Sequence, residues 1–163
     1  MLPFVQTARL FIAPLTVDDS EFMRELVNTK GWLDFVGNRH VYSSEDARNF
    51  CQDIINSPTR HYSVVFNNES NLPIGIISYV KRDYLDHHDI GFAFLPAYMG
   101  LGYAYEATRA VLLQLGQQPL LATTVPDNVN SMKLLAKLGF KFDKEISRGG
   151  DKLVVFRLKK TVY

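Results

Sequence analysis

Residues 90–115 constrain the fold of this chain more than any other stretch, because the period of their hydrophobic pattern changes part-way along. Residues 90–95 form an apolar run rich in residues that favour strands. From Ala104 onward the apolar positions recur at helical spacing. The change coincides with Gly100 and Gly102, so the sequence predicts a strand, a tight turn and then a helix.

The start of this predicted helix is suited to binding a phosphate group. The first amide N–H groups of a helix lack intrahelical partners, and the helix dipole adds a partial positive charge. An ordinary strand-to-helix turn would use the same glycines, so that reading stays open. A Walker A loop fits poorly, because no lysine followed by Ser or Thr stands at the required spacing. A GxGxxG dinucleotide motif also fits poorly, because Tyr105 occupies the position of its third glycine.

The loop resembles the acyl-CoA loop of the GCN5-related N-acetyltransferases, the GNAT superfamily. The family pattern is Gln or Arg, two residues, Gly, one residue, then Gly or Ala, and it falls on Met99, Gly102 and Ala104. Gly100 and Tyr103 match a common form of the loop. Met99 departs from the pattern, since relatives usually carry Gln or Arg there. Main-chain amides hold most of the diphosphate in the family, so the resemblance implies a weakened but not abolished grip.

A second stretch, residues 126–140, resembles the family's Asn-x-x-Ser helix that ends in Lys-x-Gly-Phe. Asn128 and Ser131 match the first part of that motif, and Lys137 and Gly139 match the second. Considered alone, these residues describe a well-capped amphipathic helix that ends at a glycine. Two motifs in the family's order are more specific than either one by itself.

Further features are similar to one branch of the superfamily, the RimJ/RimL-type ribosomal-protein N-acetyltransferases. They are the run at residues 89–96 and the early segment that contains Gly31, Trp32, Gly37 and Arg39. The resemblance covers essentially the whole chain, and residues 1–163 are expected to form a single GNAT domain.

The order of predicted elements indicates a mixed α/β fold. Helices are expected at residues 17–28, before Pro58, after the glycine loop and after residue 127, whereas residues 30–42 look irregular. The resemblance implies a central, mostly antiparallel sheet, flanked by helices and splayed between its fourth and fifth strands to admit the pantetheine arm. The predicted strands are at residues 8–13, 61–67, 73–82, 88–95, 120–125, 141–147 and 153–158.

Composition limits the classes of partner. The 163 residues are 47% hydrophobic and 21% charged, which is typical of a globular protein. The net charge of +1 gives no reason to expect nucleic acid or an anionic membrane as a partner. Cys51 is the only cysteine and is expected to be an inert, buried thiol. With no apparent targeting segment, membrane span or metal-ligand spacing, we expect a cytoplasmic monomer or homodimer without a metal.

The resemblance implies acetyl-CoA as the donor and a primary amine, on a small molecule or a peptide, as the acceptor. The amine would attack the acetyl carbonyl directly, while a strand N–H stabilises the oxyanion. Ser131 is a candidate to protonate the leaving sulfur, directly or through water, and an ordinary hydroxyl in the first turn of the helix is the alternative. Many relatives use a tyrosine as this acid, but Leu135 stands at that position here. The residues implied to bind the donor are Phe92, Ala93, Phe94, Leu95, Met99, Gly100, Leu101, Gly102, Tyr103, Ala104, Asn128, Ser131 and Lys137.

The general base is chosen among three residues. Asp89 is preferred to His88 and Glu106, although a free aspartate has a pKa of about 3.9 and would need burial to raise it. Glu106 opens the predicted helix, where it would also stabilise the helix dipole. A mechanism without a single essential base is a further alternative.

The acceptor site is expected to involve Trp32 and Phe35 as an aromatic wall, together with Asp89; simple packing of either aromatic ring is the alternative. The absent tyrosine and Met99 also leave room for an acyl-CoA sensor without turnover. A transferase for another acyl group, such as succinyl, would need a cationic residue near the thioester, and the sequence does not identify one.

Overall fold

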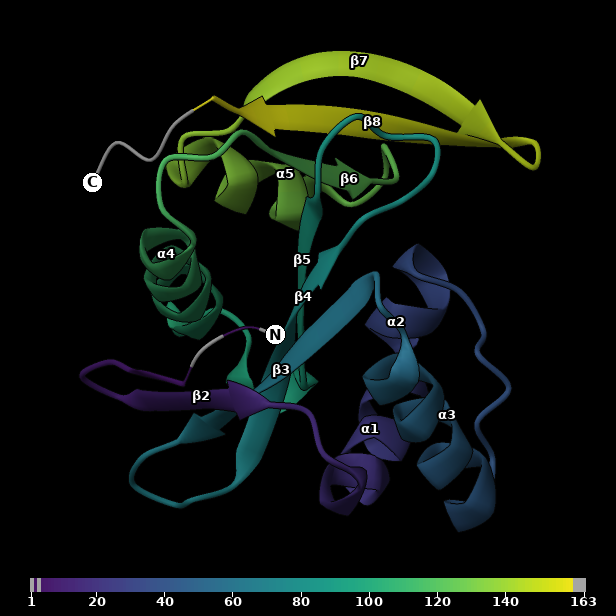
Figure 1. Cartoon of the computed structure of the whole chain (residues 1–163), viewed down its shortest axis with the longest axis vertical. Coiled ribbons are helices and arrows are strands. Elements are labelled where there is room, and N and C mark those ends of the chain that lie inside the picture. The colour runs from purple at the N-terminus through teal and green to yellow at the C-terminus, as the bar shows by residue number, and fades with distance from the viewer. Residues whose placement is uncertain (1, 3, 160–163) are drawn as a thin grey trace.

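An eight-stranded sheet runs through the computed structural model, which describes residue 2 and residues 4–159 (Figure 1). Its strand order is β1-β2-β3-β4-β5-β6-β8-β7. All neighbouring strands are antiparallel except β5 and β6, which are parallel. The strands are β1 (Val5–Gln6), β2 (Leu10–Pro14), β3 (Arg60–Asn67), β4 (Pro73–Val80), β5 (Asp89–Phe94), β6 (Leu120–Thr124), β7 (Lys141–Arg148) and β8 (Asp151–Leu158).

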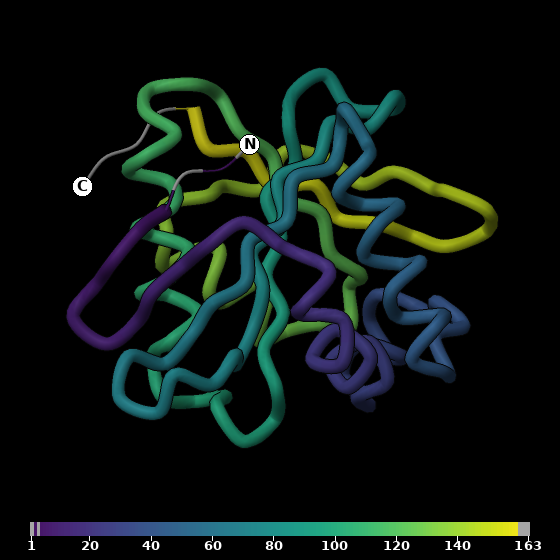
Figure 2. Tube along the Cα trace, turned by 60° about the horizontal axis from the view of Figure 1, so that its bottom comes forward, coloured from purple at the N-terminus to yellow at the C-terminus, as the bar shows by residue number. Residues whose placement is uncertain are grey.

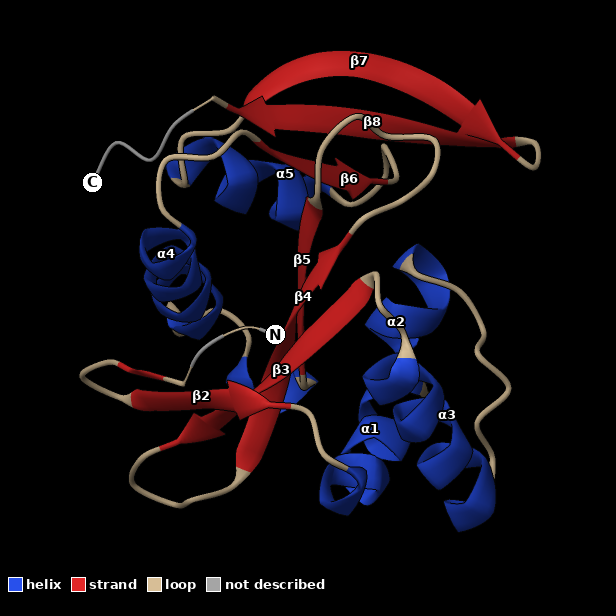
Figure 3. Ribbon diagram, viewed as in Figure 1, coloured by secondary structure: helices blue, strands red, loops and turns tan. Residues whose placement is uncertain are grey.

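Helices cover both faces of the sheet (Figure 3). One face carries α1 (Ser20–Val27), α2 (Lys30–Phe35) and α3 (Ser44–Asn56), and the other carries α4 (Tyr103–Leu115) and α5 (Val129–Lys137). In two views, the tip of the β7–β8 hairpin extends to the side of the molecule on which α2 lies (Figures 1 and 2). The mixed α/β architecture expected from the sequence is confirmed.

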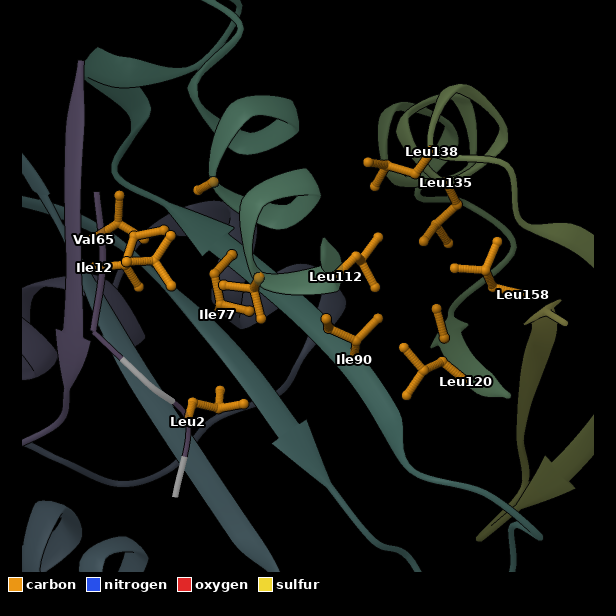
Figure 4. Packing of buried hydrophobic residues seen from close by; sticks show 14 of the residues in the cluster. Leu2, Ile12, Val65, Ile77, Ile90, Leu112, Leu120, Leu135, Leu138 and Leu158 are labelled. Atoms are coloured by element: carbon orange, nitrogen blue, oxygen red, sulfur yellow. The ribbon is translucent and has the colours of Figure 1, made fainter. Parts of the chain in front are cut away.

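Two large hydrophobic cores of the described residues hold these layers together, and a small cluster of Leu85, Leu121 and Val155 adds to them. Figure 4 shows the core beneath α4 and α5, where Leu112 lies beside Ile77 and Ile90 of the sheet and Leu135 lies near Leu158. The second core joins the helices α1 to α3 to the opposite face. Neighbouring residues on one strand contribute to different cores, since Val65 belongs to the first and Val64 to the second. Each fully buried leucine contributes about 2 kcal/mol of hydrophobic stabilisation.

Capping boxes start the first helical segment and α3, as their spacing predicts. In α3, Asp46 N donates to Ser43 Oγ at 3.0 Å, and Ser43 N donates to Asp46 Oδ2 at 3.1 Å. Thr16 and Asp19 form the same motif. That box opens a short 3-10 turn, Val17–Asp19, which leads into α1, so the helix expected at residues 17–28 is divided.

The prediction of an irregular stretch at residues 30–42 is wrong in its first half, because residues 30–35 form α2. The Thr29 hydroxyl caps this short helix by accepting a hydrogen bond from Trp32 N at 3.3 Å, and Trp32 is buried in the second core. A helix of this length is not stable alone, so tertiary packing decides it. Strand β1 was also missed, because two residues carry no readable period.

Candidate functional site

The sheet forks between β5 and β6. The two strands register at a single pair, Asp89 with Leu121, and Leu121 N donates to His88 O at 2.9 Å. Beyond this pair they run apart, as Figure 3 shows. The expected splay between the fourth and fifth predicted strands is therefore confirmed, with the fork between β5 and β6 because β1 adds a strand before them.

The fork leaves backbone groups of β5 available to a ligand. Leu95 N donates to Ile74 O at 2.9 Å, so by the antiparallel alternation the odd-numbered residues of this strand bond to β4. The N–H and C=O groups of Phe92 and Phe94 consequently point toward the fork. Among the residues that the structure describes, none on β6 is in register with these two. An amide-containing chain that entered the fork could pair with them as a strand does.

The glycine loop lies between β5 and α4, where the change of period predicts it. A short 3-10 turn, Pro96–Tyr98, precedes it, and Gly100 and Gly102 adopt positive φ angles of 75° and 83°. Gly102 is the N-cap of α4. The amide N–H groups of residues 101–105 donate to no acceptor within residues 4–159, so they are free to bind an anion.

Side chains from the start of the chain fasten this loop. Arg9 Nη1 donates to Leu101 O at 3.1 Å, and Arg9 Nε lies 2.7 Å from Glu106 Oε1. The Arg9 guanidinium also lies over the Tyr103 ring, 4.2 Å from its centroid. Thr7 Oγ1 donates to Glu106 Oε2 at 2.6 Å. The loop and the first turn of α4 are therefore tied to the β1–β2 turn by several bonds.

Both carboxylate oxygens of Glu106 take part in the contacts that hold the glycine loop. Partial burial raises its pKa, but hydrogen bonds from Thr7 and Arg9 outweigh burial and hold the pKa of this carboxyl below its usual value. An ionised carboxylate with both oxygens bonded is poorly placed to accept a proton from a substrate. The role of Glu106 near the helix start is to hold the loop.

Asp89 lies at the base of the fork and is 4% exposed. Its Oδ2 accepts hydrogen bonds from Arg82 Nε at 2.8 Å and from Thr123 Oγ1 at 3.0 Å, so it links β5 to β6 and to the end of β4. Burial raises the pKa of Asp89 above its ordinary value, although Arg82 and Thr123 act in the opposite direction. Burial prevails at Asp89 because Arg82, its partner, is much more exposed to solvent.

A cleft of about 310 Å³ extends along the fork. The predicted residues that line it are Trp32, Phe35, Asp89, Phe92, Ala93, Asn128 and Ser131. Phe94, the loop residues and Lys137 lie outside it, and the Leu95 side chain is buried in the second core. Met99 is 57% exposed beside the loop. The structure thus brings together in one cavity the residues predicted to bind the amine substrate and some of those predicted to bind acetyl-CoA. The glycine loop lies outside this cavity.

Helix α5 begins at the cleft. Asn128 caps the helix, since its side chain accepts a hydrogen bond from Ser131 N at 3.2 Å, and both residues line the cavity. The Ser131 hydroxyl forms no hydrogen bond with the described residues, so its proton is available. Leu135 is 1% exposed and supplies no acid. Lys137, at the far end of α5, places its Nζ 4.2 Å from the centroid of the Tyr105 ring on α4.

His88, the alternative base, and Cys51, the expected inert thiol, both lie outside the cleft. The His88 ring stacks on Tyr79 with centroids 4.2 Å apart, and it does not line the cleft. Burial, followed by the nearby Lys81, lowers the pKa of His88. Cys51 is fully buried and burial raises its pKa to about 11, so it is the inert thiol that the sequence predicts.

Within residue 2 and residues 4–159, no cluster of three or more His, Cys, Asp or Glu side chains is arranged to hold a metal ion. No helix in that part of the chain has the length and hydrophobicity needed to cross a bilayer.

Comparison with known proteins decides the family. The Acetyltransferase (GNAT) domain family matches residues 9–141, which is most of the chain. The chain belongs to the GNAT acetyltransferase family. The match includes the fork, the glycine loop and the whole of the Asn-x-x-Ser motif helix α5.

Individual GNAT relatives agree with this assignment. The chain is 27% identical over 155 residues to the uncharacterized N-acetyltransferase YnaD of Bacillus subtilis strain 168, covering 90% of each protein. An acetyltransferase of the GNAT family from Bacillus anthracis has a similar structure, with a TM-score of 0.80, 23% identity and coverage of 96% of this chain and 98% of that one.

A third similar structure is RimL, a ribosomal L7/L12 α-N-protein acetyltransferase in complex with coenzyme A. Its TM-score is 0.82 at 15% identity, covering 97% of this chain and 98% of that one. At this identity the likeness establishes the shared fold, which agrees with the resemblance to the RimJ/RimL-type GNAT branch.

Several residues of the candidate site were not predicted as such from the sequence. Arg9 and Thr7 lie far from the glycine loop along the chain, and only their contacts with Glu106 in the folded chain reveal that they hold it. Arg82, Tyr62 and Tyr84 line the cleft from strands and a loop that carry no motif. The one signal for Arg82 in the sequence was Asp89 at the start of a buried strand, because a buried carboxylate needs a cationic partner.

Proposed function

We propose that this protein transfers an acetyl group from acetyl-CoA to a primary amine by direct attack of the amine, with residues 1–163 acting as one GNAT domain. The observation that carries the proposal is the juxtaposition of a forked sheet, a glycine loop with free amides and a cleft containing a buried aspartate. Each is suited to one requirement of acyl transfer, and together they provide a held donor and a positioned acceptor.

The chain's own residues suit the parts of acetyl-CoA. The free amides of residues 101–105 would bind the pyrophosphate, with Met99, Gly100 and Gly102 shaping that loop. The bare backbone edge at residues 92–95 would pair with the pantetheine amides, and Asn128 and Ser131 would border that arm. Lys137 would contribute positive charge beside Tyr105. When bound, acetyl-CoA supplies the acetyl group as a reactive thioester.

Asp89 is proposed to take the proton from the attacking amine, directly or through one water. Its raised pKa brings the carboxylate closer to the range in which a base works near neutral pH. A backbone N–H of β5 near Phe92 would stabilise the developing oxyanion. The Ser131 hydroxyl would give its proton to the departing sulfur, and the proton that Asp89 took from the amine would return to the Ser131 oxygen through water. The amine nitrogen gains the acetyl group as the carbon–sulfur bond breaks, so both residues end in their starting protonation states.

The acceptor class follows from the relatives only in outline. RimL is named for acting on the α-amine of a ribosomal protein, so peptide N-termini belong among the amines to test beside small molecules. We also keep two expectations from the sequence, a cytoplasmic location and a monomer or homodimer. Size-exclusion chromatography with light scattering tests the oligomeric state.

An acyl-CoA sensor without turnover is the alternative function. Two observations favour it: Met99 is an exposed, uncharged residue beside the loop, and buried Leu135 supplies no acid in the cleft. Calorimetry with acetyl-CoA, followed by thiol release over a panel of amines, separates the two functions. Tight binding with thiol release from at least one amine supports the transferase. Tight binding without release from any amine supports the sensor.

A further inference from the structure

The charge of the cleft indicates what kind of amine it accepts. The charged side chains among its described lining residues are Arg39, Arg82 and Asp89. Arg82 and Asp89 form an ion pair with each other, so they contribute no net charge. Arg39 follows α2, is exposed, and forms no ion pair or hydrogen bond with any residue that the structure describes. The cleft therefore contains one uncompensated positive charge.

A second unpartnered polar group lies in the same cavity. Tyr62, on β3, lines the cleft, and its hydroxyl has no hydrogen-bond partner within residues 4–159. Burial raises the pKa of Tyr62, and Arg39 is the foremost of the cations that act in the opposite direction. The phenol therefore stays protonated at neutral pH and can donate a hydrogen bond to an anion near Arg39.

The remaining wall beside Arg39 is apolar. Phe35 and Val36, just before it in sequence, are 37% and 45% exposed and line the cleft together with buried Trp32. No carboxylate other than the paired Asp89 faces the cavity from the described residues. A polycationic amine would therefore find no free counter-charge there, whereas an acceptor with an anionic group and an apolar part would complement this surface.

We propose that the acceptor is an amine that also carries a carboxylate, and that Arg39 binds this carboxylate with help from the Tyr62 hydroxyl. The inference rests on the proposed function and names the substrate class of the same site. The carboxylate has two possible sources, the α-carboxylate of an apolar amino acid or an acidic side chain next to a peptide N-terminus. Arg39 is a specificity-determining residue, since its guanidinium can bind a carboxylate through two hydrogen bonds.

The experiment compares matched acceptors with acetyl-CoA in the wild type, R39Q and R39K. One arm uses L-phenylalanine against L-phenylalaninamide, and the other uses the C-terminal amide of the peptide Ser-Glu-Ala against the C-terminal amide of Ser-Gln-Ala. The measured quantity is the ratio of kcat/KM for the acid to that for its amide, which in R39Q should fall by about 10-fold or more in one arm. The arm that responds identifies the source of the carboxylate. R39K should retain part of the preference.

The matched control is R48Q, which removes the same charge from an exposed arginine on α3 that does not line the cleft. The proposal is overturned if the ratio is unchanged by R39Q in both arms, or if R48Q lowers it equally. It is also overturned if R39Q reduces the use of succinyl-CoA while leaving both ratios unchanged, because Arg39 would then bind the acyl donor.

A binding measurement keeps this inference separate from the proposed function. Calorimetry with N-acetyl-L-phenylalanine and with the C-terminal amide of N-acetyl-Ser-Glu-Ala needs no turnover, and R39Q should weaken the binding of one of them by about 10-fold. Thiol release with neutral amines but no effect of R39Q on binding overturns the inference alone. Absence of thiol release with every amine overturns the transferase, and the binding result still decides the role of Arg39.

Discussion

The two ends of the fork are built from different chemical groups. At the glycine loop, the groups proposed to bind a ligand are main-chain amides, and side chains such as Arg9 and Glu106 hold the backbone from the other side. At the cleft, the groups proposed to contact the ligand are the side chains of three lining residues, Arg39, Tyr62 and Asp89. A main-chain site tolerates Met99, because the amides do not depend on residue type, whereas a side-chain site can change its ligand with one substitution.

The largest effect is expected at the side-chain end. D89N should lower kcat by about 100-fold or more and flatten the acidic limb of the pH profile, because it removes the proposed base. Acetyl-CoA affinity should be unchanged. D86N is the control, since Asp86 lies in the same loop region, is more exposed and does not line the cleft. A wild-type pH profile in D89N would exclude Asp89 from proton transfer.

A second variant tests whether Asp89 acts as a base or only forms a structural ion pair with Arg82. R82Q removes a cation that lowers the pKa of Asp89, so this pKa should rise further. Since the base works in its ionised form, the acidic limb of kcat/KM should move to higher pH, with activity recovered above it. An equal loss of activity at every pH would instead indicate that the pair only holds the fork together.

At the main-chain end, G102V should weaken acetyl-CoA binding by about 10- to 100-fold, because a β-branched residue at positive φ is strained by about 1 to 3 kcal/mol and the loop must move to relieve it. Calorimetry measures the effect. G149V is matched, since Gly149 also has positive φ, at 56°, but lies in the β7–β8 turn. Equal affinities in G102V and the wild type would remove this loop from the site.

A smaller effect is expected when the support of the loop is removed. R9Q should raise the Kd for acetyl-CoA by about 5- to 10-fold with little change in kcat, because the loop loses its bond to Leu101 O and its ion pair. R24Q is the control, since Arg24 likewise bonds a carbonyl and a carboxylate, but on α1. A change confined to kcat would contradict a role in donor binding.

The smallest effect concerns stability. The folded state lowers the pKa of Glu106, so this group stabilises the protein above its unfolded pKa of about 4.3, and the contribution is lost as pH falls through the folded pKa. E106Q should reduce the free energy of unfolding by about 1 kcal/mol at pH 7, with the difference shrinking as the pH falls into the acidic range. Urea unfolding over this pH range measures it, and a difference independent of pH would contradict the ionic origin.

Local signals allowed much of the fold to be predicted from the sequence. These signals are the capping boxes at Thr16 and Ser43, the change of hydrophobic period at the glycine loop, and the apolar stripe of α4. Each depends only on residues that are close together in the sequence. The elements that were missed, β1 and α2, are too short to carry a period. They are stable because Val5 and Trp32 pack into cores made by distant residues.

The site divides in the same way. The sequence by itself determined the glycine loop, the cap at Asn128 and the acetyltransferase family, because backbone conformation and helix capping depend on neighbouring residues. Only the tertiary structure decided that Arg9 supports the loop, that Arg82 pairs with Asp89, and that Arg39 lies in the cleft without an ion-pair partner among the described residues. Partners of charged side chains are set by which segments the sheet brings together, and that depends on the packing of the whole chain.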